Sequence, residues 1–156
     1  MEALARHSAG LADAPAPGGA PADSAAPESI GKYPVDRVLG RGGMGTVYLC
    51  RHPELQIDVA VKVLRRDLCW DEHHVQRFLA EARLVSHLDH PNIVRIYDVD
   101  RCGEQPFIVQ EYIGGGDLNS RLESSPSGSL SPAAALRIVT AVATALEAAE
   151  RAHIVH

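Results

Sequence analysis

A glycine-rich turn between two apolar stretches is the feature that most constrains the fold of this chain. Four of the six residues from Gly40 to Gly45 are glycine, so few side chains would keep a bulky anionic ligand away from the backbone. Backbone N–H groups in such a turn can point at phosphate oxygens. More than one class of nucleotide-binding protein uses the spacing G-x-G-x-x-G, and the residues after the turn decide between them.

The segment after the turn argues against a dinucleotide-binding oxidoreductase, in which the glycine turn closes a strand and opens a helix. Here residues 46–51 are rich in β-forming side chains, and a turn through His52 and Pro53 follows them. Residues 58–64 form the next predicted strand, because β-branched residues dominate them. We therefore expect strands on both sides of the glycine turn.

A lysine and a glutamate stand at informative places beyond the turn. Lys62 lies among apolar residues of its predicted strand, where an ammonium group is costly unless it is paired. Residues 71–88 are predicted to form a helix with Asp71 as N-cap, because apolar residues recur there at three- and four-residue steps. Glu81 sits beside this apolar stripe, so it can face the sheet. A glycine turn, a buried lysine and a glutamate on a helix match the parts with which protein kinases hold ATP.

The motifs around these residues resemble those of a bacterial serine/threonine protein kinase of the eukaryotic-like type. In the family's order they read L-G-R-G-G-M-G-T-V-Y, V-A-V-K, R-F-L-A-E-A-R-L, H-P-N-I-V and F-I-V-Q-E-Y-I-G-G-G-D-L, and the resemblance covers residues 33–156. It implies an α+β fold whose small lobe, about residues 31–112, holds a five-stranded antiparallel sheet and one helix. A hinge at about residues 110–116 and the start of a helical large lobe at residues 117–156 would follow.

The remaining predicted elements fit that order. Strands are expected over residues 93–99 and 107–112, and the three glycines at 114–116 mark the joint interpreted as the hinge. A short helix is expected over residues 117–122. A longer helix begins at Ser131 and Pro132, a capping hydroxyl followed by proline, and runs to about residue 152. Its predicted apolar face consists of Leu136, Val139, Val142, Ala143, Leu146 and Ala149.

The resemblance implies an ATP site that draws on most of these elements. Lys62 would hold the α- and β-phosphates, and Glu81 would hold Lys62 in place. Backbone groups of Glu111 and Ile113 would bind the adenine edge. Gln110 would occupy the gatekeeper position, where an apolar residue is commoner, and Asp117 lies where the family often contacts ribose or substrate. The lid over the phosphates and the apolar walls of the adenine pocket would come from Leu39, Gly40, Arg41, Gly42, Gly43, Met44, Gly45, Thr46, Val47 and Ala60.

The last residues resemble the segment that leads into the catalytic loop H-R-D-x-x-x-x-N, and the sequence stops at its histidine, His156. The catalytic aspartate and the residues that bind Mg²⁺ would follow it, so we expect ATP binding without phosphoryl transfer. The complete domain would use ATP and Mg²⁺ to phosphorylate Ser or Thr of a protein that the sequence does not identify. The alternative is a degraded kinase that acts as a nucleotide- or partner-binding module.

The composition of the chain indicates which partners are excluded, which segment is disordered, and how the cysteines and histidines behave. A net charge of −5, with Arg65–Arg66 as the longest basic run, argues against a nucleic-acid partner. Residues 1–30 are dominated by Ala, Pro, Gly and Ser and predict a disordered tail. The three cysteines lie far apart and predict reduced thiols. The histidines at positions 73, 74, 87 and 90 are not expected to bind a metal, because no cysteine or carboxylate completes a ligand set.

A cytoplasmic location is expected for these residues. The chain does not begin with a basic segment and an apolar core, so no signal peptide is predicted. No stretch approaches the roughly 18 apolar residues of a membrane span, although later residues of a full-length protein could add an anchor. The apolar face of the helix after Ser131 normally packs against later elements, so we expect self-association or aggregation of this chain alone.

Overall fold

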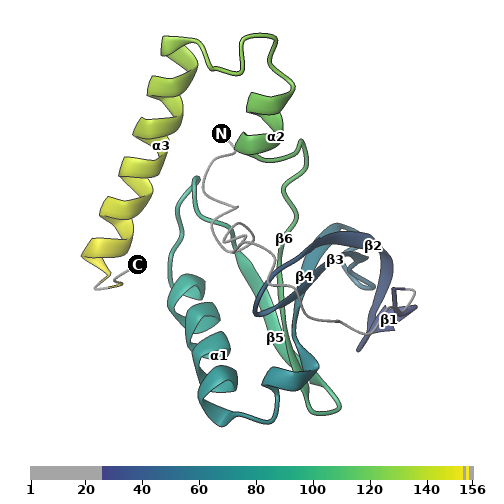
Figure 1. Cartoon of the computed structure of the whole chain (residues 1–156). Helices are drawn as coiled ribbons and strands as arrows, with labels where there is room; N and C mark the ends of the chain where they lie inside the picture. The colour runs from purple at the N-terminus through teal and green to yellow at the C-terminus, as the bar shows by residue number, and fades with distance from the viewer. Residues whose placement is uncertain (1–25, 153, 155–156) are drawn as a thin grey trace.

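The computed structural model describes residues 26–152 and residue 154 (Figure 1). The predicted disordered tail lies outside the described residues over positions 1–25, as do His153 and His156. In chain order the elements are β1 (Ser29–Ile30), β2 (Tyr33–Arg41), β3 (Gly45–Arg51), β4 (Asp58–Leu64), a 3₁₀ turn (Arg66–Leu68), α1 (Glu72–Ser86), β5 (Ile96–Cys102), β6 (Gln105–Glu111), α2 (Leu118–Glu123) and α3 (Pro132–Arg151).

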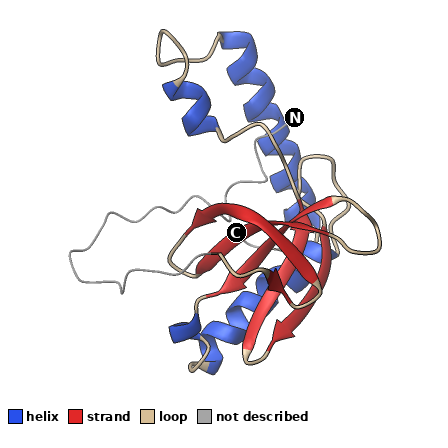
Figure 2. Ribbon diagram, turned by 90° about the vertical axis from the view of Figure 1, so that its right-hand side faces the viewer, coloured by secondary structure: helices blue, strands red, loops and turns tan. Residues whose placement is uncertain are grey.

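The strands form an antiparallel sheet in the order β1-β2-β3-β4-β6-β5. The sheet curls, α1 lies against one of its faces, and α2 and α3 stand apart from it (Figures 1 and 2). This arrangement confirms the predicted α+β class and the predicted small lobe of sheet plus one helix.

The sheet has six strands within the described residues, not the five predicted, because β1 lies in the segment predicted as a tail. Ile30 pairs with Tyr33 across a tight turn in which Gly31 has a φ of 55°, a left-handed conformation that glycine adopts readily. The Val35 N–H donates to the Glu28 carbonyl at 2.9 Å, and Ile30 is buried. The boundary placed at residue 30 is therefore wrong, since the sheet begins at Ser29.

Strand β5 begins later than predicted, because a turn takes up the residues before it. The Asn92 N–H donates to His90 Nδ1 at 3.2 Å, and the Ile93 N–H donates to the His90 carbonyl at 3.0 Å. This turn fixes residues 90–93 in a conformation that a strand does not use. β5 consequently covers Ile96–Cys102 instead of residues 93–99.

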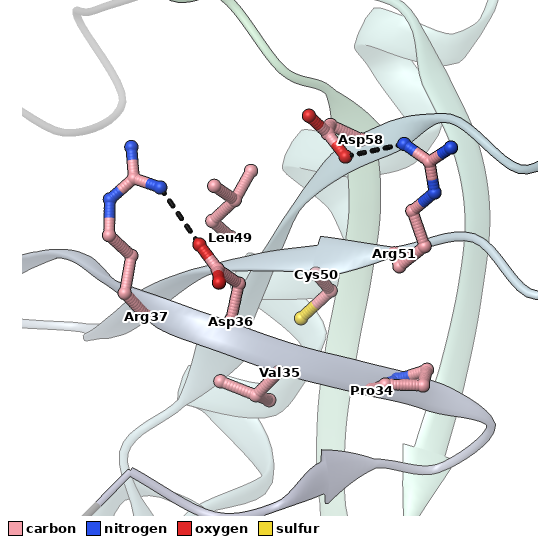
Figure 3. A pocket seen from close by; sticks show the side chains of 8 residues that line it. All are labelled: Pro34, Val35, Asp36, Arg37, Leu49, Cys50, Arg51 and Asp58. Atoms are coloured by element: carbon pink, nitrogen blue, oxygen red, sulfur yellow. Dashed lines mark hydrogen bonds and ion pairs between the residues drawn. The ribbon is translucent and has the colours of Figure 1, made fainter.

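Strand β2 shifts register against β3 near Asp36, and a pocket of about 420 Å³ opens there (Figure 3). Its charged side chains pair with one another, Arg37 with Asp36 at 2.9 Å and Arg51 with Asp58 at 2.8 Å. The pocket is lined by Pro34, Val35, Asp36, Arg37, Leu49, Cys50, Arg51 and Asp58. None of these eight lining residues belongs to the predicted ATP site.

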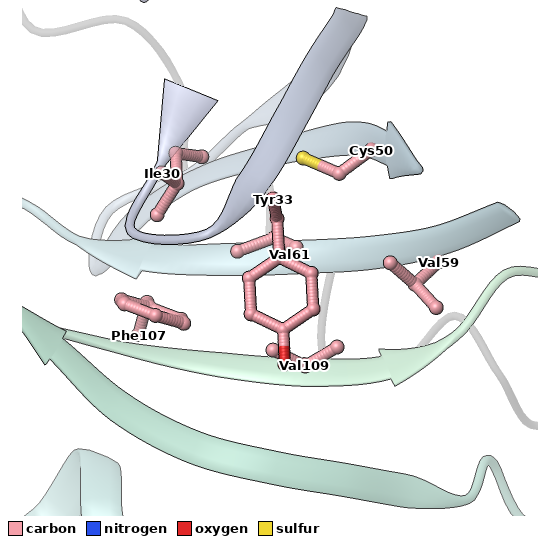
Figure 4. Close-up of a cluster of buried hydrophobic side chains, with 7 residues drawn as sticks. All are labelled: Ile30, Tyr33, Cys50, Val59, Val61, Phe107 and Val109. Atoms are coloured by element: carbon pink, nitrogen blue, oxygen red, sulfur yellow. The ribbon is translucent and has the colours of Figure 1, made fainter. Parts of the chain in front are cut away.

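A hydrophobic cluster covers the sheet face that points away from α1. Its buried members are Ile30, Tyr33, Cys50, Val59, Val61, Phe107 and Val109 (Figure 4). The Tyr33 hydroxyl donates to Asp98 Oδ2 at 3.0 Å and so joins β2 to β5 at the far edge of the curled sheet. Burial, followed by this hydrogen bond, raises the pKa of Tyr33 to about 12, and burial raises the pKa of the Cys50 thiol to about 12. We call this set the outer cluster.

Helix α1 covers the opposite face. Asp71 Oδ1 accepts the His73 N–H at 2.9 Å, which confirms the predicted N-cap. The helix ends at Ser86, two residues before the predicted end, with His87 as its C-cap. Its buried residues pack with two sheet residues to form the inner cluster, whose members are Leu64, Val75, Phe78, Leu79, Ala82 and Ile108.

Helix α3 begins at the predicted cap, where Ser131 Oγ accepts the Ala134 N–H at 3.3 Å. Helix α2 begins at Leu118, one residue after the predicted start, because Asp117 is its N-cap and accepts the Ser120 N–H at 2.7 Å. Ala145 alone is buried among the residues of α3, all of which the structure describes. The exposed apolar face is therefore largely as predicted.

Helix α3 also corrects one expectation. Its length and composition would let it cross a membrane, because an 18-residue window has a mean hydropathy of 1.3, whereas the sequence analysis predicts no such stretch. One helix of this kind is weak evidence for a membrane span, because the core helix of a soluble domain passes the same test.

Candidate nucleotide-binding site

The glycine turn is the tip of the β2–β3 hairpin. The Gly42 N–H donates to the Gly45 carbonyl at 2.8 Å, and the Gly45 N–H donates back to the Gly42 carbonyl at 3.3 Å. The Met44 carbonyl accepts the Arg65 N–H at 2.9 Å, and the Met44 side chain packs on the inner cluster. The turn is thus held against the chain that leaves β4, above the face that carries α1.

Three glycines of this turn distinguish what the fold requires from what a bound ligand would require. A Cβ at Gly45 would lie 2.0 Å from the Val63 carbonyl oxygen, so the β3–β4 packing itself requires glycine there. A Cβ at Gly40 or Gly43 would meet no atom of the described residues within 4 Å, and neither glycine has a left-handed φ. The fold therefore does not explain glycine at 40 and 43, whereas a ligand that approaches the backbone does.

Lys62 is the buried cation of the site. It is 6% exposed, and it lies in β4 directly opposite Val47 of β3 and Ile108 of β6. Its Nζ lies 3.4 Å from Glu81 Oε1 and 5.6 Å from the centroid of the Phe78 ring, both on α1. The predicted pair therefore forms, and the aromatic face adds a favourable cation–π contact.

The pair leaves capacity for a further anion. A lysine ammonium has three N–H donors, and within the described part of the chain Glu81 is its one hydrogen-bond acceptor. The Glu81 side chain is 42% exposed, so water screens the attraction between the two charges. Lys62 is thus positioned by α1 while most of its donors stay available to phosphate oxygens.

Two apolar residues lie beside Lys62 on the same face of the sheet. Val47 is directly opposite Lys62, and Ala60 precedes Lys62 by two residues, so all three point to the α1 side. Gln110 lies directly opposite Ala60. Thr46 pairs with Val63 and points to the outer face. Of the predicted lid residues, Thr46 can therefore meet a nucleotide on the α1 side through its backbone alone.

The segment after β6 brings the predicted adenine edge next to this face. The Glu111 N–H donates to the Arg95 carbonyl at 2.9 Å, so Glu111 can contact a base through its carbonyl. The Tyr112 hydroxyl accepts a hydrogen bond from Arg37 Nη2 at 3.3 Å. Gly115 and Gly116 have φ values of 95° and 80°, a left-handed bend for which glycine is suited. Asp117 caps α2 at the end of this bend, and its predicted contact with ribose or substrate stays a prediction.

Several contacts that support the site were missed by sequence reasoning. The Arg95 N–H donates to Glu111 Oε2 at 3.4 Å, and Asn92 Nδ2 donates to Thr144 Oγ1 of α3 at 3.2 Å. A side chain that reaches a helix 52 residues later leaves no local pattern in the sequence. The contact of the Phe78 ring with Lys62 was not predicted either.

Comparison with known proteins agrees with this geometry. Residues 33–156 match the protein kinase domain family. The chain is 40% identical over 126 residues to the serine/threonine-protein kinase PrkC of Bacillus subtilis, covering 81% of this chain and 19% of that protein. It is 40% identical over 126 residues to the serine/threonine-protein kinase Pkn1 of Myxococcus xanthus, covering 81% of this chain and 18% of that protein.

Solved structures give the same result. The crystal structure of the PknI kinase domain of Mycobacterium tuberculosis matches with a TM-score of 0.68 and 33% identity, covering 79% of this chain and 49% of that chain. The present chain thus spans about a fifth of the length of the two curated relatives and about half of the solved domain.

Proposed function

Because this chain belongs to the protein kinase domain family, we propose that it supplies the ATP-binding half of a protein serine/threonine kinase. The observation that carries the proposal is the buried Lys62, paired with Glu81 at 3.4 Å on the sheet face that lies below the glycine turn. A lysine held in this way can neutralise phosphate charge without moving.

The residues fit a nucleotide in three places. The backbone of Leu39–Val47 would lie over the phosphates, where Gly40 and Gly43 leave open space. Val47 and Ala60 would cover one face of the adenine. The Glu111 carbonyl and the Ile113 N–H would bind its edge, with Gln110 at the rear.

Magnesium enters the proposal through the complete domain. Mg²⁺ would neutralise the triphosphate charge and orient the γ-phosphate for transfer to a protein hydroxyl. The 156 residues contain neither an H-R-D nor a D-F-G motif, so the residues that would hold Mg²⁺ and accept the hydroxyl proton are not among them. We therefore propose that this polypeptide alone binds ATP weakly and does not transfer phosphate.

A titration with a fluorescent ATP analogue tests nucleotide binding. Lys62→Met is expected to weaken binding by about tenfold or more, because it removes the cation that faces the phosphates. Lys32→Met is the matched control, since Lys32 is exposed, its Nζ lies 3.8 Å from Asp98 Oδ2 on β5, and it is not one of the predicted site residues. Equal affinities for the two variants and the unaltered chain would contradict the proposal.

A phosphotransfer assay tests the second part. With ATP, Mg²⁺ and a generic protein substrate, the 156-residue chain is expected to give no signal above that of Lys62→Met. Turnover that Lys62→Met abolishes would show that these residues suffice for catalysis and would overturn this part of the proposal.

The exposed face of α3 favours a second role for the isolated chain, as a module that binds a partner. Leu136 and Val139 are 67% and 62% exposed, and burial of such side chains favours association by about 1.5–3 kcal/mol each. We propose that these 156 residues self-associate through α3 when no other partner covers it.

A further inference from the structure

Gln110 is a polar side chain in an otherwise apolar row of the sheet. The antiparallel register places Leu49, Ala60, Gln110 and Ile96 side by side across β3, β4, β6 and β5. Directly opposite residues have Cβ atoms about 4.5–5.5 Å apart, so Gln110 adjoins Ala60. The side chain points to the α1 face, because Ile108, two residues earlier, belongs to the inner cluster. Gln110 therefore shares a face with Lys62.

The Gln110 amide has unused hydrogen-bonding capacity. No hydrogen bond joins this side chain to another of the described residues, and the residue is half-buried. Neither amide atom of Gln110 is among the fully buried side-chain atoms without a hydrogen-bond partner in the described residues, so both amide atoms can be reached by solvent. An amide carries one acceptor oxygen and two N–H donors, so a ligand in the cleft can use either kind of group.

The neighbouring hinge residue, Glu111, favours adenine over guanine. The Glu111 N–H is already donated to Arg95, so Glu111 presents a carbonyl oxygen to a base. A carbonyl suits the 6-amino group of adenine and repels the 6-oxygen of guanine. The Gln110 amide stands one residue away and can donate to that oxygen, which a leucine or methionine side chain cannot do.

We propose that Gln110 is a specificity-determining residue that lets this cleft bind guanine nucleotides as well as adenine nucleotides. The inference rests on the nucleotide-binding function proposed above. The amide accepts from the amino group of adenine or donates to the oxygen of guanine by turning about its last bond. An apolar side chain at the same position leaves the guanine oxygen without a donor.

Displacement of a fluorescent ATP analogue from the 156-residue chain by ATP and by GTP tests the inference. For the unaltered chain the two dissociation constants are expected to agree within about tenfold. Gln110→Leu is expected to weaken GTP by about fivefold, the effect of one neutral hydrogen bond. ATP is expected to be weakened less, because the Glu111 carbonyl still accepts from the amino group of adenine. Gln110→Glu keeps the size and an acceptor but loses the amide donors, so it is expected to weaken GTP and spare ATP.

The possible results distinguish a failure of this inference from a failure of the proposed function. An unchanged ratio of ATP to GTP affinity in both variants overturns the inference while leaving ATP binding intact. A chain that binds neither nucleotide overturns the proposed function and this inference together. Lys62→Met serves as the reference, because it is expected to weaken ATP and GTP alike. If Gln110→Leu melts at a lower temperature, Gln110→Glu, which has nearly the same shape, decides the result.

Discussion

Lys62 is the side chain for which we propose a contact with the phosphates. Its neighbours across the strands are apolar, and Glu81 is its partner within the described residues. An ammonium in such a place would be unfavourable without a carboxylate. The position of Glu81 therefore decides whether Lys62 stays fixed beneath the glycine turn.

Glu81→Gln tests this dependence. The amide keeps the shape and loses the charge, so ATP is expected to bind several-fold more weakly because Lys62 is less well held. The unfolding free energy is expected to fall by about 1 kcal/mol or less, because Glu81 is 42% exposed and water screens the pair. Glu54→Gln, an exposed acid in the β3–β4 turn, is the control. A loss of ATP affinity equal to that of the control would argue against the role.

Because of Tyr33 and Cys50, the free energy of unfolding is expected to decrease at alkaline pH. Both folded-state pKa values are raised to about 12, from ordinary values of 10.0 and 9.0, with burial as the first cause. The folded state keeps these protons where the unfolded chain releases them, so their contribution is full below about pH 9 and falls as the pH rises toward 12. Urea unfolding at several pH values should show this decline.

Tyr33→Phe should flatten part of that decline. The variant removes the titrating hydroxyl, so the slope between pH 10 and 12 should decrease, while the unfolding free energy at pH 7 should fall by about 1 kcal/mol through loss of the bond to Asp98. Tyr97→Phe is the control, because Tyr97 is exposed. An unchanged slope in Tyr33→Phe would mean that this hydroxyl does not contribute.

At the scale of elements, two glycines of the β2–β3 hairpin are expected to affect different properties, one the stability of the fold and the other the binding of a ligand. Gly45→Ala would place a Cβ 2.0 Å from the Val63 carbonyl oxygen and is expected to cost about 3 kcal/mol of unfolding free energy. Gly43→Ala meets open space, so stability should change by less than about 1 kcal/mol, whereas ATP affinity should fall. Thermal melts and nucleotide titrations of both variants check this, and a destabilised Gly43→Ala would contradict it.

The elements also show what the sequence could predict. The strands, α1, its Asp71 cap and the Lys62–Glu81 pair were predictable, because short-range patterns and motif spacing determine them. Strand β1 was hidden by the Ala- and Pro-rich residues before it, and the bond from Tyr33 to Asp98 joins positions 65 residues apart. Such contacts depend on the curl of the sheet, which no local pattern specifies.

The arrangement of the candidate site could be predicted to a similar extent. Lys62, Val47, Ala60 and Gln110 lie on one face because strand alternation is regular. The outward direction of Thr46 follows from the same alternation and was overlooked. The Glu111 N–H donated to Arg95 was not predictable, since it depends on how the chain enters β5 after the H-P-N turn.

For the whole molecule, α3 is expected to determine the association state of this chain. The double variant Leu136→Glu/Val139→Glu places charge on the exposed face and should shift sedimentation of the 156-residue chain toward the monomer. Leu55→Glu changes another exposed leucine, which is 58% exposed in the β3–β4 turn, and should leave association unchanged. A monomeric unaltered chain would contradict the proposed self-association.

The position of strand β1 determines at which residue a shortened fragment of this domain should begin. The family match starts at residue 33, yet Ile30 is buried in the outer cluster and the Glu28 carbonyl accepts the Val35 N–H. A protein trimmed to that start would uncover Tyr33 and Phe107 and lose the burial of Ile30, about 1.5–3 kcal/mol. A fragment that begins at residue 26 should therefore melt at a higher temperature and yield more soluble material than one that begins at residue 33.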